Sequence, residues 1–120
     1  MHELSLAQNI LEIVEQYVPR EQSRSVKSIK LRLGEMSGIV SDSLEFCFSA
    51  IIAETPMSNA LLEIERVPFT LACRTCKNSF ASEAGVVLCP ECGGYDTDVV
   101  SGTEMQVVEI ELRETEPSQC

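Results

Sequence analysis

Residues 73–76 of this chain read Cys-Arg-Thr-Cys, and residues 89–94, after twelve intervening positions, read Cys-Pro-Glu-Cys-Gly-Gly. Two Cys-x-x-Cys pairs at this separation can bring four sulfur atoms to the corners of a tetrahedron. Zn²⁺ suits that arrangement because it has no d-electron preference for another geometry and binds thiolates. The two glycines let the chain turn tightly past the last cysteine, where backbone N–H groups can approach the sulfur atoms. The spacing therefore predicts a zinc site made of Cys73, Cys76, Cys89 and Cys92.

Other interpretations of these cysteines are disulfide pairing, four unrelated thiols, and an iron site like that of rubredoxin. Paired spacings of this kind rarely arise without a metal. The chain has six cysteines, four of them in metal spacing, which fits a reducing compartment better than a secreted disulfide scaffold. We therefore expect zinc, and iron stays open as the alternative metal.

Composition narrows the class of protein. A chain of 120 residues predicts one domain, or one domain with a small insert. The 19 acidic side chains outnumber the 9 basic ones, and a net charge of −10 repels phosphate backbones. Without Trp, and with two Tyr and four Phe, the chain offers little for bases to stack on, so we do not expect nucleic-acid binding. The chain opens with no positively charged apolar leader and has no bilayer-length apolar stretch, which predicts a cytoplasmic protein without a membrane segment.

Two segments carry the three- and four-residue spacing of apolar side chains that is typical of amphipathic helices. The first covers residues 4–18. The second begins at Ser41 or Asp42 and ends before Pro56. Asp42 and Glu45 have the spacing of a capping box, so we expect their side chains to close the start of this helix.

Three segments alternate between apolar and polar residues and therefore predict β-strands: residues 26–33, 62–67 and 105–113. The outer face of the first strand is basic and those of the other two are acidic, which places the first strand in the middle of the sheet. In the third strand, Val108 and Leu112 are expected to point towards the core together with Ile110.

These elements give an α+β fold class, with two helices packed on a three-stranded sheet and an inserted four-cysteine, zinc-ribbon-like domain. The predicted zinc-binding domain covers residues 68–100, with short strands over residues 69–72 and 86–88. The α+β domain comprises residues 1–67 and 101–120.

The only histidine, His2, stands one residue from the α-amine of Met1. An amine, the following amide nitrogen and an imidazole can close adjoining chelate rings around one ion. Deprotonated amide nitrogens suit square-planar Ni²⁺ or Cu²⁺ better than Zn²⁺. The bulk of His2 should also prevent removal of Met1, which would keep the native amine. The alternative interpretation is that the chain begins Met-His without binding a metal there.

Four motifs occur in order along the chain: Met1-His2-Glu3-Leu4, Leu33-Gly34-Glu35, the two Cys-x-x-Cys pairs, and Ser101-Gly102-Thr103-Glu104. Together they resemble the HypA/HybF family of hydrogenase nickel-incorporation proteins, and the resemblance runs nearly from end to end. It implies a nickel metallochaperone for maturation of [NiFe]-hydrogenase, serving urease as well in some organisms.

The resemblance also implies ligands and partners. Nickel, the transferred cargo, would contact Met1 through its amine, His2 through its imidazole and backbone nitrogen, and Glu3 as a further residue; structural zinc would take Cys73, Cys76, Cys89 and Cys92. The partners would be a HypB-like GTPase, the hydrogenase large subunit and urease maturation proteins, with a monomer or a dimer both open. Lys77 departs from the pattern, because many zinc knuckles place Gly directly after the second cysteine.

Catalysis is not expected. The lone histidine lies at the terminus, so no Ser–His or Cys–His pair supports a nucleophile, and no Gly-rich phosphate loop is present. The alternative function is a zinc-ribbon adaptor protein in transcription or translation, against which the acidic charge and the few aromatic residues weigh. An iron electron carrier with four cysteine ligands is a third interpretation, and it predicts a red protein.

Overall fold

The computed structural model describes residues 2–82 and 85–113. The chain divides into two compact units, and each is described by itself. The first unit comprises Met1–Leu31, Ile39–Ile64 and Val107–Cys120, and the second comprises Arg32–Gly38 and Glu65–Gln106. The domain boundaries at residues 67/68 and 100/101 stay a prediction.

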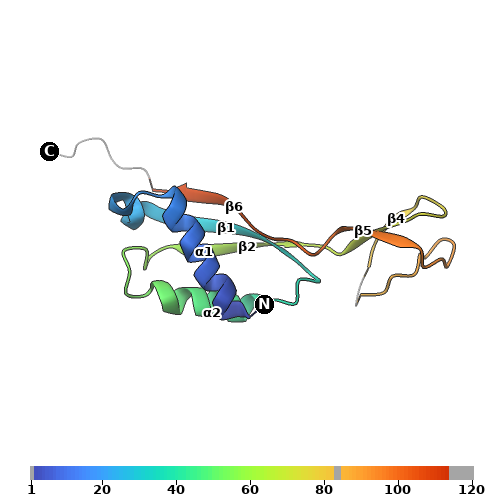
Figure 1. Ribbon diagram of the computed structural model, residues 1–120, viewed down its shortest axis with the longest axis horizontal. Coiled ribbons are helices and arrows are strands. Elements are labelled where there is room, and N and C mark those ends of the chain that lie inside the picture. Colours follow the sequence, from blue (N-terminus) through green and yellow to red (C-terminus); the bar gives the residue numbers. More distant parts are fainter. Residues whose placement is uncertain (1, 83–84, 114–120) are drawn as a thin grey trace. The chain divides into compact units, whose positions relative to one another are not determined.

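The long elements confirm the predicted α+β class. The chain forms α1 (Glu3–Tyr17), the 3-10 helix η1 (Arg20–Ser25), β1 (Val26–Gly34), α2 (Ser41–Ile52), β2 (Leu61–Val67) and, near its end, β6 (Met105–Leu112) (Figure 1). The three long strands form one sheet in the order β2-β1-β6, so β1 is the central strand, as the charges predict. Within the described residues, no helix has both the length and the apolar character that crossing a bilayer requires.

The core of the first unit is built by the apolar faces of α1, α2 and β1. The two α-helices pack against each other, and each buries side chains at three- or four-residue intervals. Every second residue of β1 is buried over the stretch that contains Ile29 and Leu31. The most deeply buried apolar residues of this unit, each at most 2% exposed, are Ala7, Ile10, Val14, Val26, Ile29, Leu31, Leu44, Phe48 and Ile52. Each large side chain among them contributes on the order of 1.5–3 kcal/mol through burial.

The prediction that Asp42 and Glu45 form a capping box at the start of α2 is wrong. The N-cap residue is Val40, and no side chain makes the usual N-cap hydrogen bond there. Asp42 already lies in the first turn of the helix. Its negative charge therefore complements the positive end of the helix dipole instead of closing a capping box.

The edge strand β6 also differs from the prediction. Val108 and Leu112 are each 40% exposed, so the expectation that both point into the core is wrong. Because β6 has a neighbouring strand on one side only, its side chains receive less cover than those of β1. The charge pairing does hold: Lys27 Nζ lies 3.1 Å from Glu111 Oε1, and Arg32 Nε lies 3.4 Å from Glu65 Oε2.

The second unit contains a small sheet of its own. Strands β3 (Thr70–Cys73), β4 (Ser79–Ala81) and β5 (Thr97–Ser101) pair in the order β4-β3-β5, and both pairings are antiparallel. Leu71 of β3 lies opposite Phe80 on one side and Val99 on the other. The strand predicted over residues 86–88 does not form. The chain uses β4 instead, because it follows β3 closely enough to form a hairpin.

Three backbone segments of the second unit meet where two glycines touch. The Gly34 N–H donates to the Glu104 carbonyl at 2.8 Å, and the Met36 N–H donates to the Gly102 carbonyl at 2.8 Å. A Cβ atom on Gly34 would lie 2.1 Å from the carbonyl carbon of Gly102, and one on Gly102 would lie 2.5 Å from Phe69 Cα. Only residues without a side chain permit this approach.

Replacing Gly34 by Ala should therefore destabilise the protein strongly. We expect the Gly34→Ala variant to lose about 3 kcal/mol of unfolding free energy, because the added methyl group meets backbone that cannot move aside. Gly38→Ala is the matched control: Gly38 has a φ of +81°, but a Cβ there would meet nothing within 4 Å. The control should lose only about 1 kcal/mol through backbone strain. Urea unfolding measures both, and equal losses would contradict the close approach.

Candidate metal centres

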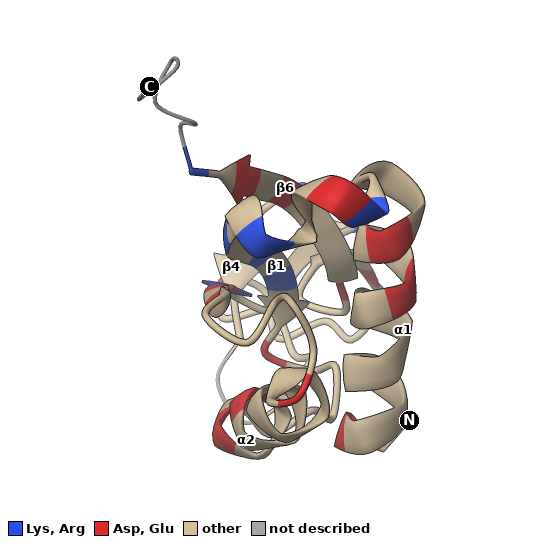
Figure 2. Ribbon diagram, turned by 90° about the vertical axis from the view of Figure 1, so that its left-hand side faces the viewer, with Lys and Arg blue, Asp and Glu red and all other residues tan. Residues whose placement is uncertain are grey.

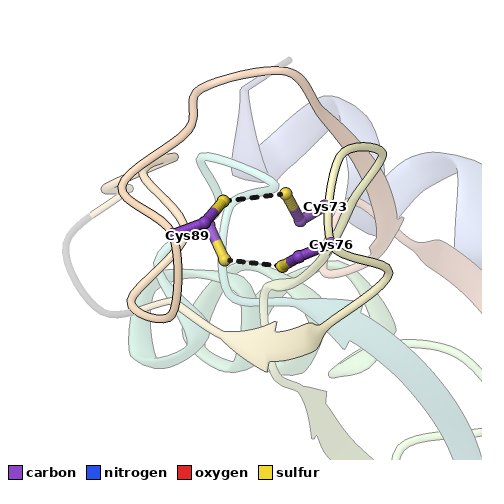
Figure 3. A group of neighbouring side chains, drawn as sticks. Cys73, Cys76 and Cys89 are labelled. Carbon is purple, nitrogen blue, oxygen red and sulfur yellow. Dashed lines mark hydrogen bonds between the residues drawn. The ribbon is translucent and has the colours of Figure 1, made fainter.

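The four cysteines of the two Cys-x-x-Cys pairs form one cluster. Their sulfur atoms all lie within 4.8 Å of one another. The sulfur of Cys73 lies 3.7 Å from that of Cys92, and the sulfur of Cys76 lies 3.6 Å from that of Cys89. Figure 3 shows Cys73 and Cys76 facing Cys89 across the cluster. Disulfides would need sulfur atoms about 2.05 Å apart, so these cysteines are not paired in that way.

The sulfur spacing fits a tetrahedral ion. Four sulfur atoms that each lie about 2.3 Å from a central Zn²⁺ are about 3.8 Å from one another. The two sulfur separations given above, 3.7 Å and 3.6 Å, are close to that edge length. Cys73 and Cys89 are buried, whereas Cys76 and Cys92 are exposed. The cluster can therefore hold one tetrahedral metal ion at the surface of the second unit.

The two cysteine pairs are built alike. The Lys77 N–H donates to the Cys73 carbonyl at 3.0 Å, and the Gly93 N–H donates to the Cys89 carbonyl at 2.8 Å. Lys77 has a φ of 67°, and Gly93 has a φ of 73°. Lys77 thus adopts the left-handed conformation that glycine adopts in the second pair. Lys77 in place of glycine therefore leaves the turn unchanged and adds backbone strain.

Hydrogen bonds set the protonation of the cluster. The backbone N–H three residues further along lowers the pKa of Cys73, and the equivalent group lowers the pKa of Cys89 to about 6. For Cys76, the backbone N–H two residues further along favours the thiolate, but the hydrogen bond to the Cys89 sulfur and partial desolvation raise its pKa to about 12. For Cys92, a backbone N–H likewise favours the thiolate, but the hydrogen bond to the Cys73 sulfur and partial desolvation raise its pKa. Each close pair therefore combines one thiol of lowered pKa with one of raised pKa, and a dication that binds all four sulfur atoms must displace the proton of the second.

An ion-pair cluster fixes the first cysteine pair to β5. The Arg74 N–H donates to the Asp96 carbonyl at 3.0 Å, and Arg74 Nε donates to Asp98 Oδ2 at 2.9 Å. The guanidinium of Arg74 lowers the pKa of the Asp98 carboxyl group. Reasoning from the sequence missed this contact, because Arg74 and Asp98 are 24 positions apart and no local pattern pairs them.

The second unit has little apolar material to stabilise it without an ion. Among its described residues, the buried apolar side chains are those of Leu33, Phe69 and Leu71, together with two of the four cysteines. A segment of this size rarely folds on its apolar core alone, and a metal ion commonly supplies the missing stability.

The other candidate site lies at the start of the chain. Met1 lies outside the described residues. His2 is exposed and is the N-cap of α1, where its carbonyl accepts the Leu6 N–H at 3.0 Å and its side chain makes no capping hydrogen bond. Glu3 is the first residue of α1, and its Oε2 accepts the Val40 N–H at 3.2 Å. An exposed imidazole beside backbone nitrogen atoms is suited to an ion that must be taken up and released.

Because Lys77 adopts a conformation that glycine tolerates better, Lys77→Gly should stabilise the protein. We expect a gain of about 1 kcal/mol in unfolding free energy, since relief of left-handed strain outweighs the entropy cost of glycine. Lys77→Ala is the control and should change the unfolding free energy little, because alanine shares the strain. Urea unfolding at saturating zinc measures both; a Lys77→Gly variant less stable than the wild type would contradict the strain.

Comparison with known proteins agrees with the motifs. Residues 1–112 match the family described as "Hydrogenase/urease nickel incorporation, metallochaperone, hypA". The "Hydrogenase maturation factor HypA" of Geotalea uraniireducens is 43% identical over 112 residues, which cover 93% of this chain and 99% of that protein. The protein with the same name from Dehalococcoides mccartyi is 35% identical over 112 residues, which cover 93% of this chain and 94% of that one.

Two solved structures share the fold. The solution structure of the Ni metallochaperone HypA from Helicobacter pylori has a TM-score of 0.64 and 21% identity, and the match covers 96% of this chain and 100% of that chain. A second solution structure of a HypA protein has a TM-score of 0.66 and 22% identity, and the match covers 93% of this chain and 96% of that chain. These structures show a shared fold, whereas the family match over residues 1–112 and the relatives that are 43% and 35% identical confirm the family that the sequence motifs resemble. The chain belongs to the HypA family of hydrogenase/urease nickel-incorporation metallochaperones, which are maturation factors and not enzymes.

Proposed function

We propose that this chain binds Ni²⁺ at its amino terminus and delivers it during [NiFe]-hydrogenase maturation, while a resident Zn²⁺ holds the second unit in shape. The observation that carries this proposal is the contrast between two sites. One is a closed set of four sulfur ligands within 4.8 Å, and the other is an exposed histidine at the start of a helix.

Zinc is the ion that we assign to Cys73, Cys76, Cys89 and Cys92. Four thiolates complete the tetrahedral coordination of Zn²⁺ and leave no open position for a substrate, which is typical of a structural site. The pKa of Cys89, lowered to about 6, keeps one ligand ionised at neutral pH. Backbone N–H groups directed at the sulfur atoms stabilise the remaining charge of the bound cluster.

Nickel is the cargo that we assign to the segment Met1–Glu3, with Met1 and His2 as the named ligands and Glu3 as the third residue in contact with the site. The amine of Met1, the backbone nitrogen of His2 and its imidazole offer three nitrogen donors in adjoining chelate rings, which suits square-planar Ni²⁺. His2 is exposed, so a recipient protein can reach an ion held there. A site made of a few exposed atoms binds with moderate affinity and can release its ion to a more completely organised site.

The charge distribution supports transfer between proteins. Figure 2 shows acidic residues on α1, α2 and β6 of the first unit. A negative surface concentrates divalent cations and favours partners with basic surfaces. The partners that we propose are a HypB-like GTPase and the hydrogenase large subunit in the cytoplasm, with urease maturation proteins as a second route. The names of the relatives, hydrogenase maturation factors, support the hydrogenase route.

Removing the imidazole should separate the two metals. The His2→Ala variant should bind nickel at least tenfold more weakly than the wild type. It should retain one zinc per chain, because His2 is not one of the proposed zinc ligands. Equilibrium dialysis of untagged protein against Ni²⁺, followed by elemental analysis, measures both ions. A short Gly-Ser extension before Met1 is the second variant and should have the same effect, since it displaces the amine. Undiminished nickel binding in both variants would refute the assignment.

Removing zinc should unfold the second unit and leave the first unit folded. After treatment with a strong chelator, the Leu71 amide of β3 should lose its protection from hydrogen exchange, whereas the Ile10 amide of α1 should keep it. Unchanged protection of Leu71 in protein shown to be metal-free would count against a structural role.

Zinc should leave faster at pH 6 than at pH 7.5, because Cys76 and Cys92 have raised pKa values and bind the metal only after losing protons.

A further inference from the structure

A single carboxylate connects the first turns of the two α-helices in the first unit. Glu3 Oε2 accepts a hydrogen bond from the Val40 N–H at 3.2 Å, although the residues are 37 positions apart. Glu3 is the first residue of α1, and Val40 is the N-cap of α2. The contact therefore connects the start of α1 to the start of α2.

Glu3 supplies what α2 lacks in its own sequence. The first N–H groups of a helix have no partner within the helix, and a Glu at the third helical position commonly accepts from the N-cap N–H. In α2 the third helical position is Ser43, and the N-cap side chain of Val40 is apolar. Glu3 reaches across from α1 and accepts that N–H instead. An ionised acceptor makes this a charge-assisted bond, and its charge also lies near the positive ends of both helix dipoles.

We infer that the Glu3 carboxylate is a positioning group, which ties the amino-terminal segment to α2 and holds the nickel-binding atoms in place, and is not itself a nickel ligand. Both parts of this inference that concern nickel rest on the proposed nickel site, whereas the tie between Glu3 and α2 does not. The side chain would have to release the Val40 N–H in order to coordinate the ion with the oxygen that it now uses. The tether instead reduces the freedom of His2, whose peptide group adjoins Glu3, and so lowers the entropy cost of closing the chelate rings.

Three variants separate positioning from ligation. Glu3→Gln keeps a side-chain oxygen that can accept the Val40 N–H but removes the carboxylate charge. Glu3→Ala removes the acceptor altogether. Val40→Pro removes the donor without touching Glu3; the φ of −87° at Val40 is close to the proline range, and its carbonyl can still accept the Leu44 N–H.

The first measurement uses the protein without nickel and with zinc in place. Hydrogen exchange of the Val40 amide, followed by NMR, should be roughly fivefold faster in Glu3→Ala than in the wild type and within twofold of the wild type in Glu3→Gln. Equal exchange in all three proteins would show that the tether does not exist in solution and would overturn the inference. This arm does not depend on nickel, so its outcome is independent of the proposed function.

The second measurement is nickel binding by calorimetry in the same set. The nickel affinity of Glu3→Gln should be within twofold of that of the wild type, whereas Glu3→Ala and Val40→Pro should each bind nickel several-fold more weakly. The double variant that combines Glu3→Ala with Val40→Pro should bind no more weakly than either single variant. Loss of nickel in Glu3→Gln as complete as in Glu3→Ala would make the carboxylate a ligand and overturn the inference. A wild-type protein that binds no nickel would instead sink the proposed function, while the exchange result for Val40 would stand.

Discussion

Four sulfur atoms gathered within 4.8 Å are the constraint on which the second unit depends. Ionised thiols cannot remain so close without a cation, and the unit has too few buried apolar side chains to impose the arrangement by packing alone. The geometry is nevertheless prepared by the backbone. Two turns with the same hydrogen bonds, at Lys77 and at Gly93, direct N–H groups at the sulfur atoms, and the Arg74–Asp98 pair holds the first turn against β5.

The sequence predicts the features that arise from neighbouring residues. The spacing of the cysteines identifies all four members of the cluster, because each pair is formed by one local turn. Hydrophobic periodicity predicts α1, α2 and the three long strands, and opposite charges such as those of Lys27 and Glu111 predict that β1 is central. Such patterns can be recognised in the sequence because burial of one face of a helix or strand imposes a regular spacing on its apolar residues.

The sequence does not predict features that depend on residues far apart in the chain. The contact between Gly34 and Gly102 requires two segments to meet, so each glycine alone looks like an ordinary turn residue. The predicted capping of α2 is wrong for the same reason, since its acceptor is Glu3 of another helix rather than Glu45. Exposure of Val108 follows from the edge position of β6, which alternation of apolar and polar residues does not reveal.

We propose opposite tasks for the two metal sites: the four sulfur atoms would retain one ion to maintain structure, and the nitrogen atoms near His2 would release the other to a recipient protein. X-ray absorption spectroscopy of untagged protein loaded with both metals tests this division most directly, since each element has its own edge. We predict a zinc spectrum with four sulfur neighbours at about 2.3 Å and a nickel spectrum with nitrogen and oxygen neighbours only. Sulfur bound to nickel, or nitrogen and oxygen replacing sulfur around zinc, would contradict the account.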